Sequence, residues 1–587
     1  MRSSNFLLLL ASIVCLCVSS AVFSSGFDSN SAAKKEKKNL VAQCSAFLSR
    51  KEKQNFGSKK VKIIDAVWSF KEGSTKKSLS YSLPEHCLVT GKVNERVSKI
   101  DGASYSIDFE MRLPVDWNQR FLFQANGGND GAVVPALGSS LNHSIPALAK
   151  NFAVISSNAG HQNPRTSLIS GANFGGDPEA RLDYGYKANQ VLTPIAKELI
   201  EIFYKKKPEY SYFMGCSNGG RHAMVAASRL SKEYDGFVAG NPGFNLPKAA
   251  IQHAWDIQAL SEVNADVAKA LTTEEMTFVA DKVLERCDDL DGVSDGLVND
   301  IVACQSHFEL PKLACTDQTA ASVNEKTAGA NKKEMSCLAN NKITALNKIF
   351  SGPVNSKGQS LYSDWVFDAG INGADWRRWK VQGPIANLPF IAALGSSSLA
   401  KIFMTPLRDI SPSPPTLLEF LRSFDFDQDA NAIHFSDETF TESAMEFMTP
   451  PDAEKLTSLS SSGNKLMVIH GASDGVFSVK DTINWYRTLN KNHQGRANLF
   501  TRLFVVPGMN HCSGGPTTDQ FDALSVMMDW AEKGNAPDEM VASVNAENTE
   551  LPKTWSKERT RKVCSFPSVA RYNQGDVETA ESFVCTE

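Results

Sequence analysis

Hydrophobic and polar positions alternate with a period of two residues in the first part of the chain, most regularly at residues 103–113. This period predicts β-strands, because successive side chains of a strand point to opposite faces. The expected strands follow one another at short spacing, with polar turns between them, which favours an antiparallel start to a sheet. Four strands are expected, at residues 61–70, 87–93, 103–113 and 120–124.

The pattern then changes to short apolar runs that alternate with segments of helical period. Apolar residues at 184–205 recur at helical spacing, and residues 220–232 are rich in helix-forming types. Strands that alternate with helices predict a parallel sheet with right-handed crossovers, and so an α/β fold. The apolar runs, typical of buried strands, lie at residues 152–156, 210–214 and 237–240.

This alternation stops near residue 242 and resumes near residue 463. Residues 243–462 are predicted to be helical and rich in loops, and they contain three tryptophans close together, Trp365, Trp376 and Trp379. We therefore expect a main α/β domain of residues 26–242 and 463–587 with an inserted lid domain, 243–462. The main domain is completed by strands at 465–469 and 502–506 and by helices at 481–489 and 520–532.

The first 25 residues have the features of a secretory signal peptide. Arg2 precedes an apolar core at residues 6–18, and small residues follow, with cleavage expected after Ala21. A retained anchor is the alternative, but the apolar run is shorter than the ~20 residues that a spanning helix needs. We expect a secreted or periplasmic protein that has no membrane association once the signal is removed.

The composition is that of an ordinary globular protein. Of its 587 residues, 42% are hydrophobic and 21% are charged, which is enough apolar material for a large core. The formal net charge is −4, and no basic stripe is present that would neutralise phosphates. Nucleic acid is therefore excluded as a partner. The mixed charges at residues 34–38 are interpreted as a solvated linker.

Two of the 12 cysteines, Cys15 and Cys17, leave with the signal, so ten remain. An even number in an exported chain favours disulfides, and the lack of a Cys-x-x-Cys pair counts against zinc. Sequence alone does not fix the pairing. Neighbours in the chain suggest Cys44 with Cys87, Cys287 with Cys304, Cys315 with Cys337, and Cys564 with Cys585, which leaves Cys216 and Cys512.

The pentapeptide Gly-Cys-Ser-Asn-Gly at residues 215–219 follows the strand at 210–214 and precedes a helix. Strand, sharp turn and helix are the context in which Gly-x-Ser-x-Gly forms a nucleophile elbow. The glycines are needed because so tight a turn brings backbone close to backbone. An ordinary serine in a Gly-rich turn is the alternative. As an elbow, the motif would expose Ser217 at the end of the sheet.

Two further residues follow strands in the order expected for a catalytic triad. Asp474 comes after the strand at 465–469, and His511 comes after the strand at 502–506. In α/β-hydrolases the order along the chain is serine, acid and histidine. The sequence therefore predicts an α/β-hydrolase fold with Ser217 as nucleophile, His511 as base and Asp474 as the acid that orients it. Asp481, His470 and His222 remain rivals.

Two cysteines adjoin the proposed nucleophile and base. Cys216 precedes Ser217, and Cys512 follows His511. If these cysteines are bonded, their Cα atoms lie about 5.5 Å apart, which brings the serine and the histidine within reach of a hydrogen bond. Two buried thiols are the alternative.

A Gly-rich loop at residues 126–131 directly follows the strand at 120–124. It is either a plain turn or a loop that lets a backbone N–H approach a substrate oxygen, as in the oxyanion loops of esterases.

Cys-Ser in the elbow, a later Asp and a final His-Cys resemble the pattern of the tannase and feruloyl esterase family, which includes mono(2-hydroxyethyl) terephthalate hydrolase. The resemblance runs from about Cys44 to Cys585. It implies the same triad, a Cys216–Cys512 bridge, and the four other disulfides that proximity suggests. It also implies an oxyanion hole made by the backbone N–H of Asn218 and that of Gly127 or Gly128.

The resemblance further implies a structural calcium ion in the lid, and the matching stretch here is residues 287–297. Calcium takes 6–8 oxygen ligands at about 2.4 Å. A solvated acidic turn is the alternative to a calcium cage. The expected ligands are the carboxylates of Asp288, Asp291 and Asp295 and the carbonyl oxygens of Val293 and Leu297.

Together these features predict a secreted serine carboxylic ester hydrolase that cleaves small aromatic esters through an acyl-enzyme on Ser217. Esters of hydroxycinnamic acids such as ferulate come first, galloyl esters of tannins second and terephthalate monoesters third. An inactive hydrolase-like binding protein is the alternative of a different class, and an amide hydrolase would share the triad. The lid is expected to hold the aromatic ring. For its three tryptophans, packing in the core is expected ahead of contact with that ring.

Overall fold

The computed structural model describes residues 29–49, 54–56, 59–76, 79–139, 141, 145–163, 171–316 and 335–587, so the expected signal segment, 1–25, lies outside the described residues. A ten-stranded sheet forms its centre, in the order β1-β2-β5-β6-β8-β7-β9-β10-β11-β12. The strands of this sheet are β1 (Gln54–Phe56), β2 (Lys59–Ser69), β5 (His86–Val97), β6 (Ser104–Pro114), β7 (Arg120–Ala125), β8 (Ala153–Ser157), β9 (Tyr210–Cys216), β10 (Gly236–Gly240), β11 (Lys465–Gly471) and β12 (Thr501–Val506).

The sheet has an antiparallel half and a parallel half. β1, β2, β5, β6 and β8 pair antiparallel, whereas β8, β7, β9, β10, β11 and β12 pair parallel. The predicted antiparallel start is confirmed for β2, β5 and β6 but is wrong for β7. Because β8 inserts between β6 and β7, β7 begins the parallel half instead of ending the antiparallel one.

The parallel half is buried on both faces. In β11, Leu466 and Val468 belong to the core on one face, and Met467 and Ile469 belong to the core on the other. Helices α3 (Ala188–Tyr204) and α4 (Asn218–Arg229) contribute to the first core, and α17 (Ala523–Lys533) contributes to the second. Continuous apolar strands are therefore the expected pattern, because no face meets water.

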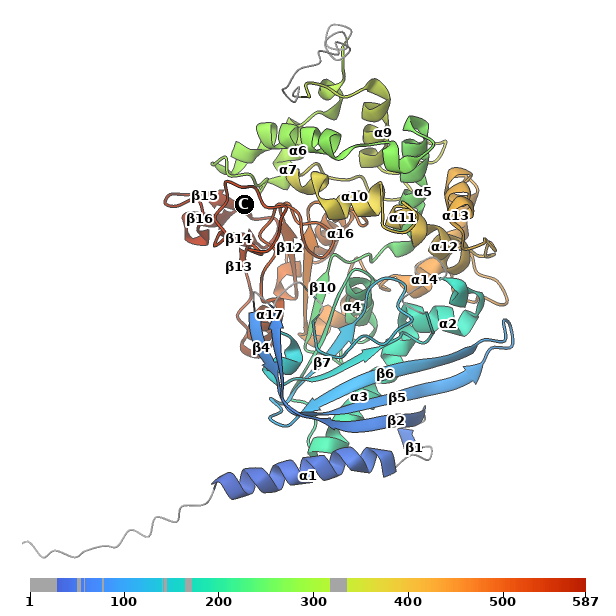
Figure 1. Ribbon diagram of the computed structural model, residues 1–587, viewed down its shortest axis with the longest axis vertical. Helices are drawn as coiled ribbons and strands as arrows, with labels where there is room; N and C mark the ends of the chain where they lie inside the picture. The colour runs from blue at the N-terminus through green and yellow to red at the C-terminus, as the bar shows by residue number, and fades with distance from the viewer. Residues whose placement is uncertain are drawn as a thin grey trace, which may run out of the picture.

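Residues 243–462, called the lid below, lie between β10 and β11 and add no strand to the central sheet in the part of the chain that the structure describes. Their division from the rest of the chain as a separate domain stays a prediction. Their helices gather above the sheet as a separate layer (Figure 1). The helices of residues 243–462 are α5 (Leu246–Val263), α6 (Thr273–Cys287), α7 (Ile301–His307), α9 (Asn340–Ser351), α10 (Ala374–Lys380), α11 (Phe390–Ala393), α12 (Gly395–Ser398), α13 (Pro414–Arg422), α14 (Ala444–Met448) and α15 (Thr457–Ser462). The remaining elements include α2 (Pro178–Leu182), α16 (Val479–Asn492) and a hairpin of β3 (Glu72–Lys76) and β4 (Leu79–Leu83).

Both ends of the described chain differ from the prediction. Residues 34–38 are exposed, but they belong to helix α1 (Ser29–Ser49) and not to a linker. After α17, which the sequence presents as the closing helix, come β13 (Glu539–Ser543), β14 (Thr560–Cys564), β15 (Val569–Tyr572) and β16 (Phe583–Thr586), which pair as two antiparallel ribbons. Figure 1 shows them beside α6 and α7 of the inserted layer.

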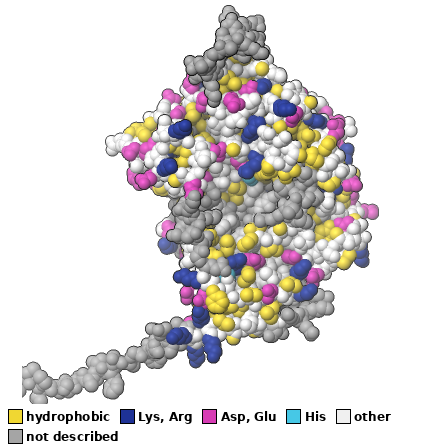
Figure 2. Space-filling view, in the orientation of Figure 1, with side chains coloured by type: hydrophobic (Ala, Val, Ile, Leu, Met, Phe, Trp, Pro, Cys, Tyr) yellow, Lys and Arg dark blue, Asp and Glu magenta, His cyan; other side chains and the backbone are white. Residues whose placement is uncertain are grey.

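The surface carries charges of both signs. Figure 2 shows Lys and Arg side chains interspersed with Asp and Glu over the visible face, which agrees with the small net charge of −4. Within the described residues, no helix combines the length and apolar character needed to cross a membrane.

Candidate active site

Ser217 lies in a sharp turn between β9 and α4. Its backbone has φ 65° and ψ −127°, a strained conformation for a residue with a side chain. The flanking glycines permit this turn: a Cβ atom on Gly215 would lie 2.5 Å from the carbonyl carbon of Gly219, and one on Gly219 would lie 2.6 Å from the carbonyl oxygen of Ala125. The nucleophile elbow predicted from the pentapeptide is therefore present in the backbone.

Ser217, His511 and Asp474 form a continuous hydrogen-bonded chain. Ser217 Oγ lies 2.8 Å from His511 Nε2, and His511 Nδ1 lies 2.8 Å from Asp474 Oδ2. With the proton on Nδ1, His511 donates to Asp474 and accepts from the serine hydroxyl. The three loops that carry these residues follow β9, β11 and β12, which all lie in the parallel half of the sheet.

Asp474 is buried, and hydrogen-bond donors surround its carboxylate. Besides His511, it accepts from Asn241 Nδ2 at 2.8 Å and from the backbone N–H of Val476 and Phe477 at 2.8 and 3.0 Å. Burial acts to raise the pKa of Asp474, but the charges and hydrogen bonds of His511 and His470 outweigh it and hold the pKa well below its usual range. Asp474 is therefore an ionised acceptor.

The three rival residues are occupied elsewhere. Asp481 accepts from Asn245 Nδ2, and burial raises its pKa to about 6. His470 is fully buried, with Nδ1 2.9 Å from Thr482 Oγ1, and its Nε2 lies 3.3 Å from Asp474 Oδ2, the oxygen that also bonds to His511. His222 Nε2 lies 2.9 Å from Asp130. None of the three bonds to Ser217.

The pKa of His511 is raised above its ordinary value of 6.5. Burial acts to lower the pKa of His511, but the charge and hydrogen bond of Asp474 and the charge of Asp375 act more strongly in the opposite direction. Asp375 belongs to α10 in the lid, and its carboxylate accepts the backbone N–H of His511 at 3.2 Å. The lid therefore supplies a second carboxylate that favours the charged histidine.

The structure contains all five disulfides that the sequence suggests. Cys216 and Cys512 are bonded across a separation of 296 residues, with their Cα atoms 6.2 Å apart, within the normal range. This bond joins the residue before the nucleophile to the residue after the histidine. The other pairs are Cys44–Cys87, Cys287–Cys304, Cys315–Cys337 and Cys564–Cys585.

The residues expected to form an oxyanion hole lie beside Ser217. Asn218 is the first residue of α4, where backbone N–H groups have no partner within the helix. A Cβ atom on Gly127 would lie 3.6 Å from Ser217 Cβ, and Gly128, with φ +66°, lines the same pocket as Ser217 and Asn218. Both glycines are therefore placed near Ser217.

An apolar pocket opens beside Ser217, between the main domain and the lid. The rings of Trp379 and Phe477 lie 5.0 and 5.4 Å from the His511 ring, centroid to centroid. His253 also lines the pocket, and burial together with the charge of Lys380 lowers its pKa to about 3, so its ring is neutral. The apolar lining consists mainly of Leu246, Trp379, Leu394, Phe403, Val476 and Phe477.

Only one of the three lid tryptophans reaches this pocket. Trp379 lines it, whereas Trp365 and Trp376 are buried in the hydrophobic core. The hydrophobic periodicity of the sequence could not show that Trp379, and not a neighbouring tryptophan, lines the pocket, because α10 is short. The sequence also gave no signal for His253 or Asp375, whose roles depend on how the lid folds over the sheet.

The family-model comparison matches residues 87–586 to "Tannase and feruloyl esterase". The chain therefore belongs to the tannase and feruloyl esterase family. It is 35% identical over 553 residues to mono(2-hydroxyethyl) terephthalate hydrolase of Piscinibacter sakaiensis, a match that covers 88% of each chain. It is 26% identical over 498 residues to a probable feruloyl esterase of Arthroderma benhamiae, covering 81% of each.

Solved structures show the same fold. Feruloyl esterase B from Aspergillus oryzae superposes with a TM-score of 0.71 at 21% identity, covering 93% of this chain and 100% of that one. Tannin acyl hydrolase from Aspergillus niger gives a TM-score of 0.65 at 19% identity, covering 93% and 95%. The predicted α/β-hydrolase fold is confirmed, and membership of this family makes the chain a carboxylic ester hydrolase.

In this member of the family, the lid is fixed to the catalytic loops by buried hydrogen bonds. Asp368 of the lid accepts from Ser473 Oγ at 2.5 Å and from the backbone N–H of Gly508 at 2.9 Å. Asn510 donates to the carbonyl oxygen of Gly370 at 2.8 Å. These bonds link the lid to the loops that carry Asp474 and His511, so the lid supports the site as well as covering it.

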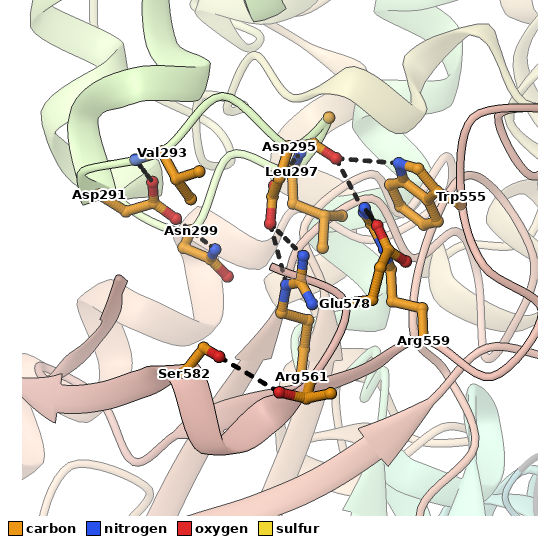
Figure 3. Close-up of polar contacts among 12 residues, drawn as sticks. Asp291, Val293, Asp295, Leu297, Asn299, Trp555, Arg559, Arg561, Glu578 and Ser582 are labelled. Carbon is orange, nitrogen blue, oxygen red and sulfur yellow. Dashed lines mark hydrogen bonds and ion pairs between the residues drawn. The ribbon is translucent and has the colours of Figure 1, made fainter. Parts of the chain in front are cut away.

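The acidic loop expected to bind calcium lies in the lid, against the C-terminal segment (Figure 3). Asp295 is fully buried and pairs with the Arg561 guanidinium, whose Nε lies 3.0 Å from its carboxylate. Arg559 Nη1 donates to the Asp295 carbonyl oxygen at 2.8 Å. Because Arg561 is in β14, a segment that the sequence did not predict to be structured, this ion pair was not foreseen.

The two other carboxylates that are expected to bind calcium, those of Asp288 and Asp291, have no cationic partner among the described residues. Asp288 accepts backbone N–H groups of Asp295 and Gly296, and Asp291 accepts from Val293 N–H and Asn299. Burial raises the pKa of both, that of Asp291 to about 6. Among the described residues, no three His, Cys, Asp or Glu side chains converge as a metal site, so calcium stays a prediction.

Proposed function

We propose that this family member is an exported serine esterase with Ser217, His511 and Asp474 as its catalytic triad. Its substrates are esters of aromatic acids in which the acyl group carries no charge. The observation that carries this proposal is the hydrogen-bonded chain from Ser217 Oγ through His511 to Asp474, with 2.8 Å at each step. Nucleophile, base and orienting acid are the groups that acyl transfer requires.

The reaction proceeds in two halves. Ser217 Oγ attacks the ester carbonyl carbon while its proton passes to His511 Nε2, and the resulting oxyanion collapses as the proton moves to the leaving alcohol. Water then attacks the acyl-enzyme, with His511 again taking the proton, and the acid leaves as Ser217 is restored. Asp474 stabilises the histidine when it is charged, because its own low pKa keeps it ionised.

The oxyanion would be stabilised by the backbone N–H of Asn218 and that of Gly127 or Gly128. One such donor contributes about 3 kcal/mol to the transition state. The position of both glycines beside Ser217 supports this part of the proposal.

The lining of the pocket favours an aromatic acyl group in the substrate. Trp379 and Phe477 present their rings beside His511, and planar aromatic groups pack favourably against such rings. The described side chains that line the pocket include no Asp, Glu, Lys or Arg. A free carboxylate would lack a cation there, and burying an unpaired charge is costly. We therefore place hydroxycinnamate esters first, galloyl esters second and terephthalate monoesters third.

A matched pair of substrates tests this order. Monomethyl terephthalate and methyl 4-carbamoylbenzoate have nearly the same shape but differ by one negative charge. We expect kcat/KM to be at least about 10-fold higher for the amide-bearing ester, and methyl ferulate to exceed methyl gallate. Equal or faster hydrolysis of the charged ester would overturn the preference for uncharged rings. Hydrolysis of a matching anilide but of no ester would indicate an amide hydrolase instead.

Replacing the nucleophile tests the triad. Ser217→Ala should abolish turnover of every active ester, whereas Ser228→Ala, farther along α4 and bonded to the Pro451 carbonyl oxygen, should leave kcat unchanged. Persistent hydrolysis by Ser217→Ala would place the nucleophile elsewhere. A wild-type protein that binds aromatic esters without turnover would indicate an inactive binding protein.

We also propose a structural calcium ion in the acidic loop, held by the carboxylates of Asp288, Asp291 and Asp295 and the carbonyl oxygens of Val293 and Leu297. Burial raises the pKa of Asp288 and of Asp291, and a divalent cation beside them would favour their ionised forms. A melting temperature that is unchanged after chelation, or metal analysis without calcium, would contradict this assignment.

Export is the final part of the proposal. Five disulfides are typical of an oxidising compartment, and the sequence of residues 1–25 has the pattern of a signal peptide. The N-terminal sequence of the mature protein tests it, because cleavage should occur near Ala21. A mature chain that begins at Met1 would contradict cleavage.

A further inference from the structure

Asp130 stands at the end of the Gly-rich loop that carries Gly127 and Gly128, yet it is buried. Its side chain is 2% exposed, and its backbone has φ 51°, in the left-handed region. The carboxylate turns toward α4, where Oδ2 lies 2.7 Å from Asn218 Nδ2 and 2.9 Å from His222 Nε2. A loop carboxylate is thus bonded to the residue next to the nucleophile.

The helix side of this contact is fixed by further hydrogen bonds. Asn218 and His222 are four residues apart in α4 and so present their side chains on the same face. Arg221 Nε donates to Asn218 Oδ1 at 2.6 Å, and the same guanidinium donates to the carbonyl oxygens of Tyr184 and Gly185 at 3.0 and 2.9 Å. Asn218 therefore has both ends of its side-chain amide engaged.

His222 is an uncharged member of this network. Burial lowers the pKa of His222 well below its ordinary value, and the charge of Arg221 adds to this effect. Asn189 Nδ2 lies 3.0 Å from His222 Nδ1, and an amide N–H₂ can only donate, so Nδ1 is the accepting nitrogen. Nε2 lies 2.9 Å from Asp130 Oδ2, and Arg221 Nη2 lies 3.1 Å from each of the two ring nitrogens. A buried network with satisfied partners holds its members in one arrangement.

The contact links the two backbone segments that the proposed oxyanion hole requires. One donor comes from the loop after β7, at Gly127 or Gly128, and the other is the N–H of Asn218 at the start of α4. Asp130 belongs to the first segment and bonds to the side chain of the second. Displacement of a catalytic group by about 1 Å can cost about 100-fold in rate, so the distance between these donors matters.

We propose that Asp130 is a positioning residue, which holds the Gly-rich loop against Asn218 and so sets the spacing of the two oxyanion-hole donors. This inference rests on the proposed esterase mechanism. Asp130 is not among the residues that line the pocket beside Ser217. Its contribution is made in the transition state, because the donors face the oxygen only as it becomes an oxyanion.

Two substitutions separate the accepting oxygen atom of Asp130 from the rest of its carboxyl group. Asp130→Ala removes both bonds and should lower kcat about 100-fold while KM changes less than about threefold. Asp130→Asn keeps a carbonyl oxygen that can accept from Asn218 and His222, so kcat should stay within about fivefold of the original. All rates are expressed per active site, counted by burst titration, so that loss of folded protein does not enter.

Inhibitor affinity gives a readout that a purely structural role would not change. An aryl boronic acid, which forms a tetrahedral adduct on Ser217, should bind Asp130→Ala about 100-fold more weakly, whereas the aromatic acid product should bind equally well. Asp481→Ala is the control, because Asp481 is another buried carboxylate bonded to an Asn side chain, outside the site. It should lower the melting temperature without changing kcat or boronate affinity.

A double-mutant cycle covers the case in which one variant folds poorly. Asn218→Ala keeps the backbone N–H but loses the bond to Asp130, so it should cost as much in kcat as Asp130→Ala, and the double variant should cost no more than either. Fully additive losses would overturn the inference. So would a boronate affinity of Asp130→Ala within threefold of the original protein. Failure of the esterase mechanism itself is distinguished by activity that survives Ser217→Ala.

Discussion

The carboxylate of Asp474 and those of the acidic loop in the lid are both buried, but different groups surround them. Asp474 accepts from a histidine, an asparagine and two backbone N–H groups, and its pKa is lowered. Asp288 and Asp291 receive mainly backbone and amide N–H groups, and burial raises the pKa of each. Among the carboxylates of this loop, Asp295 has a cationic partner in the described residues, the guanidinium of Arg561.

The difference shows how burial acts on a carboxylate. Where a protein supplies enough donors and a chargeable partner, a buried carboxylate stays ionised and is ready to stabilise a positive charge on its neighbour. Where those are missing, the same burial disfavours ionisation, and a bound cation is the remaining way to keep the charge. The first arrangement suits catalysis and the second suits a structural metal ion.

The largest effect is expected from Asp474→Asn. The amide would present N–H groups to His511 and favour the wrong tautomer, so kcat should fall about 10⁴-fold with the fold intact. Steady-state kinetics on a simple aromatic ester measure this. Asp481→Asn is the matched control and should leave kcat within about twofold. A loss of less than 10-fold for Asp474→Asn would mean that the donors around this carboxylate serve folding alone.

A smaller effect, on stability only, is expected from Asp291→Asn. Loss of a calcium ligand should lower the melting temperature by about 5 °C in the presence of calcium and abolish the further destabilisation by chelator, with kcat unchanged. Differential scanning fluorimetry with and without chelator measures this. Asp289→Asn, which alters the exposed carboxylate of the same loop, is the control. Equal behaviour of the two variants would show that no ion depends on Asp291.

The smallest effect is a shift in the pH profile. The free base of His511 is the active form, and its pKa lies above 6.5, so kcat/KM should rise with pH through a midpoint above 6.5 and be lost below it. Asp375→Asn removes one of the negative charges that raise the pKa of His511, so it should move this midpoint down by less than about one pH unit. A midpoint that stayed in place, or moved up, would exclude Asp375 as a contributor.

Much of the site could be predicted from the sequence because its signals are local. The elbow at 215–219, the strand before each triad residue, and the cysteines beside Ser217 and His511 are all patterns of neighbouring residues. Their order along the chain then limits the fold to one that brings them together. The disulfides between chain neighbours follow the same logic, because short separations close easily.

What the sequence could not provide depends on pairing between distant segments. The strand pattern of β7 is correct, but its partner β8 comes later in the chain, so local alternation could not show that β7 is parallel. The strands β13–β16 are short, at four or five residues each. The contacts of Asp130 with α4 and of Asp295 with Arg561 join residues whose spacing carries no periodic signal.

Covalent labelling tests most directly whether the distant segments assemble an activated serine. A fluorophosphonate reacts with a serine whose proton is removed by a neighbouring base, and peptide mass mapping identifies the residue that carries the phosphonate. We expect one adduct per chain, on the peptide that contains Ser217, and none after His511→Ala. An adduct on another residue, or labelling of Ser217 that persists without His511, would contradict the proposed site.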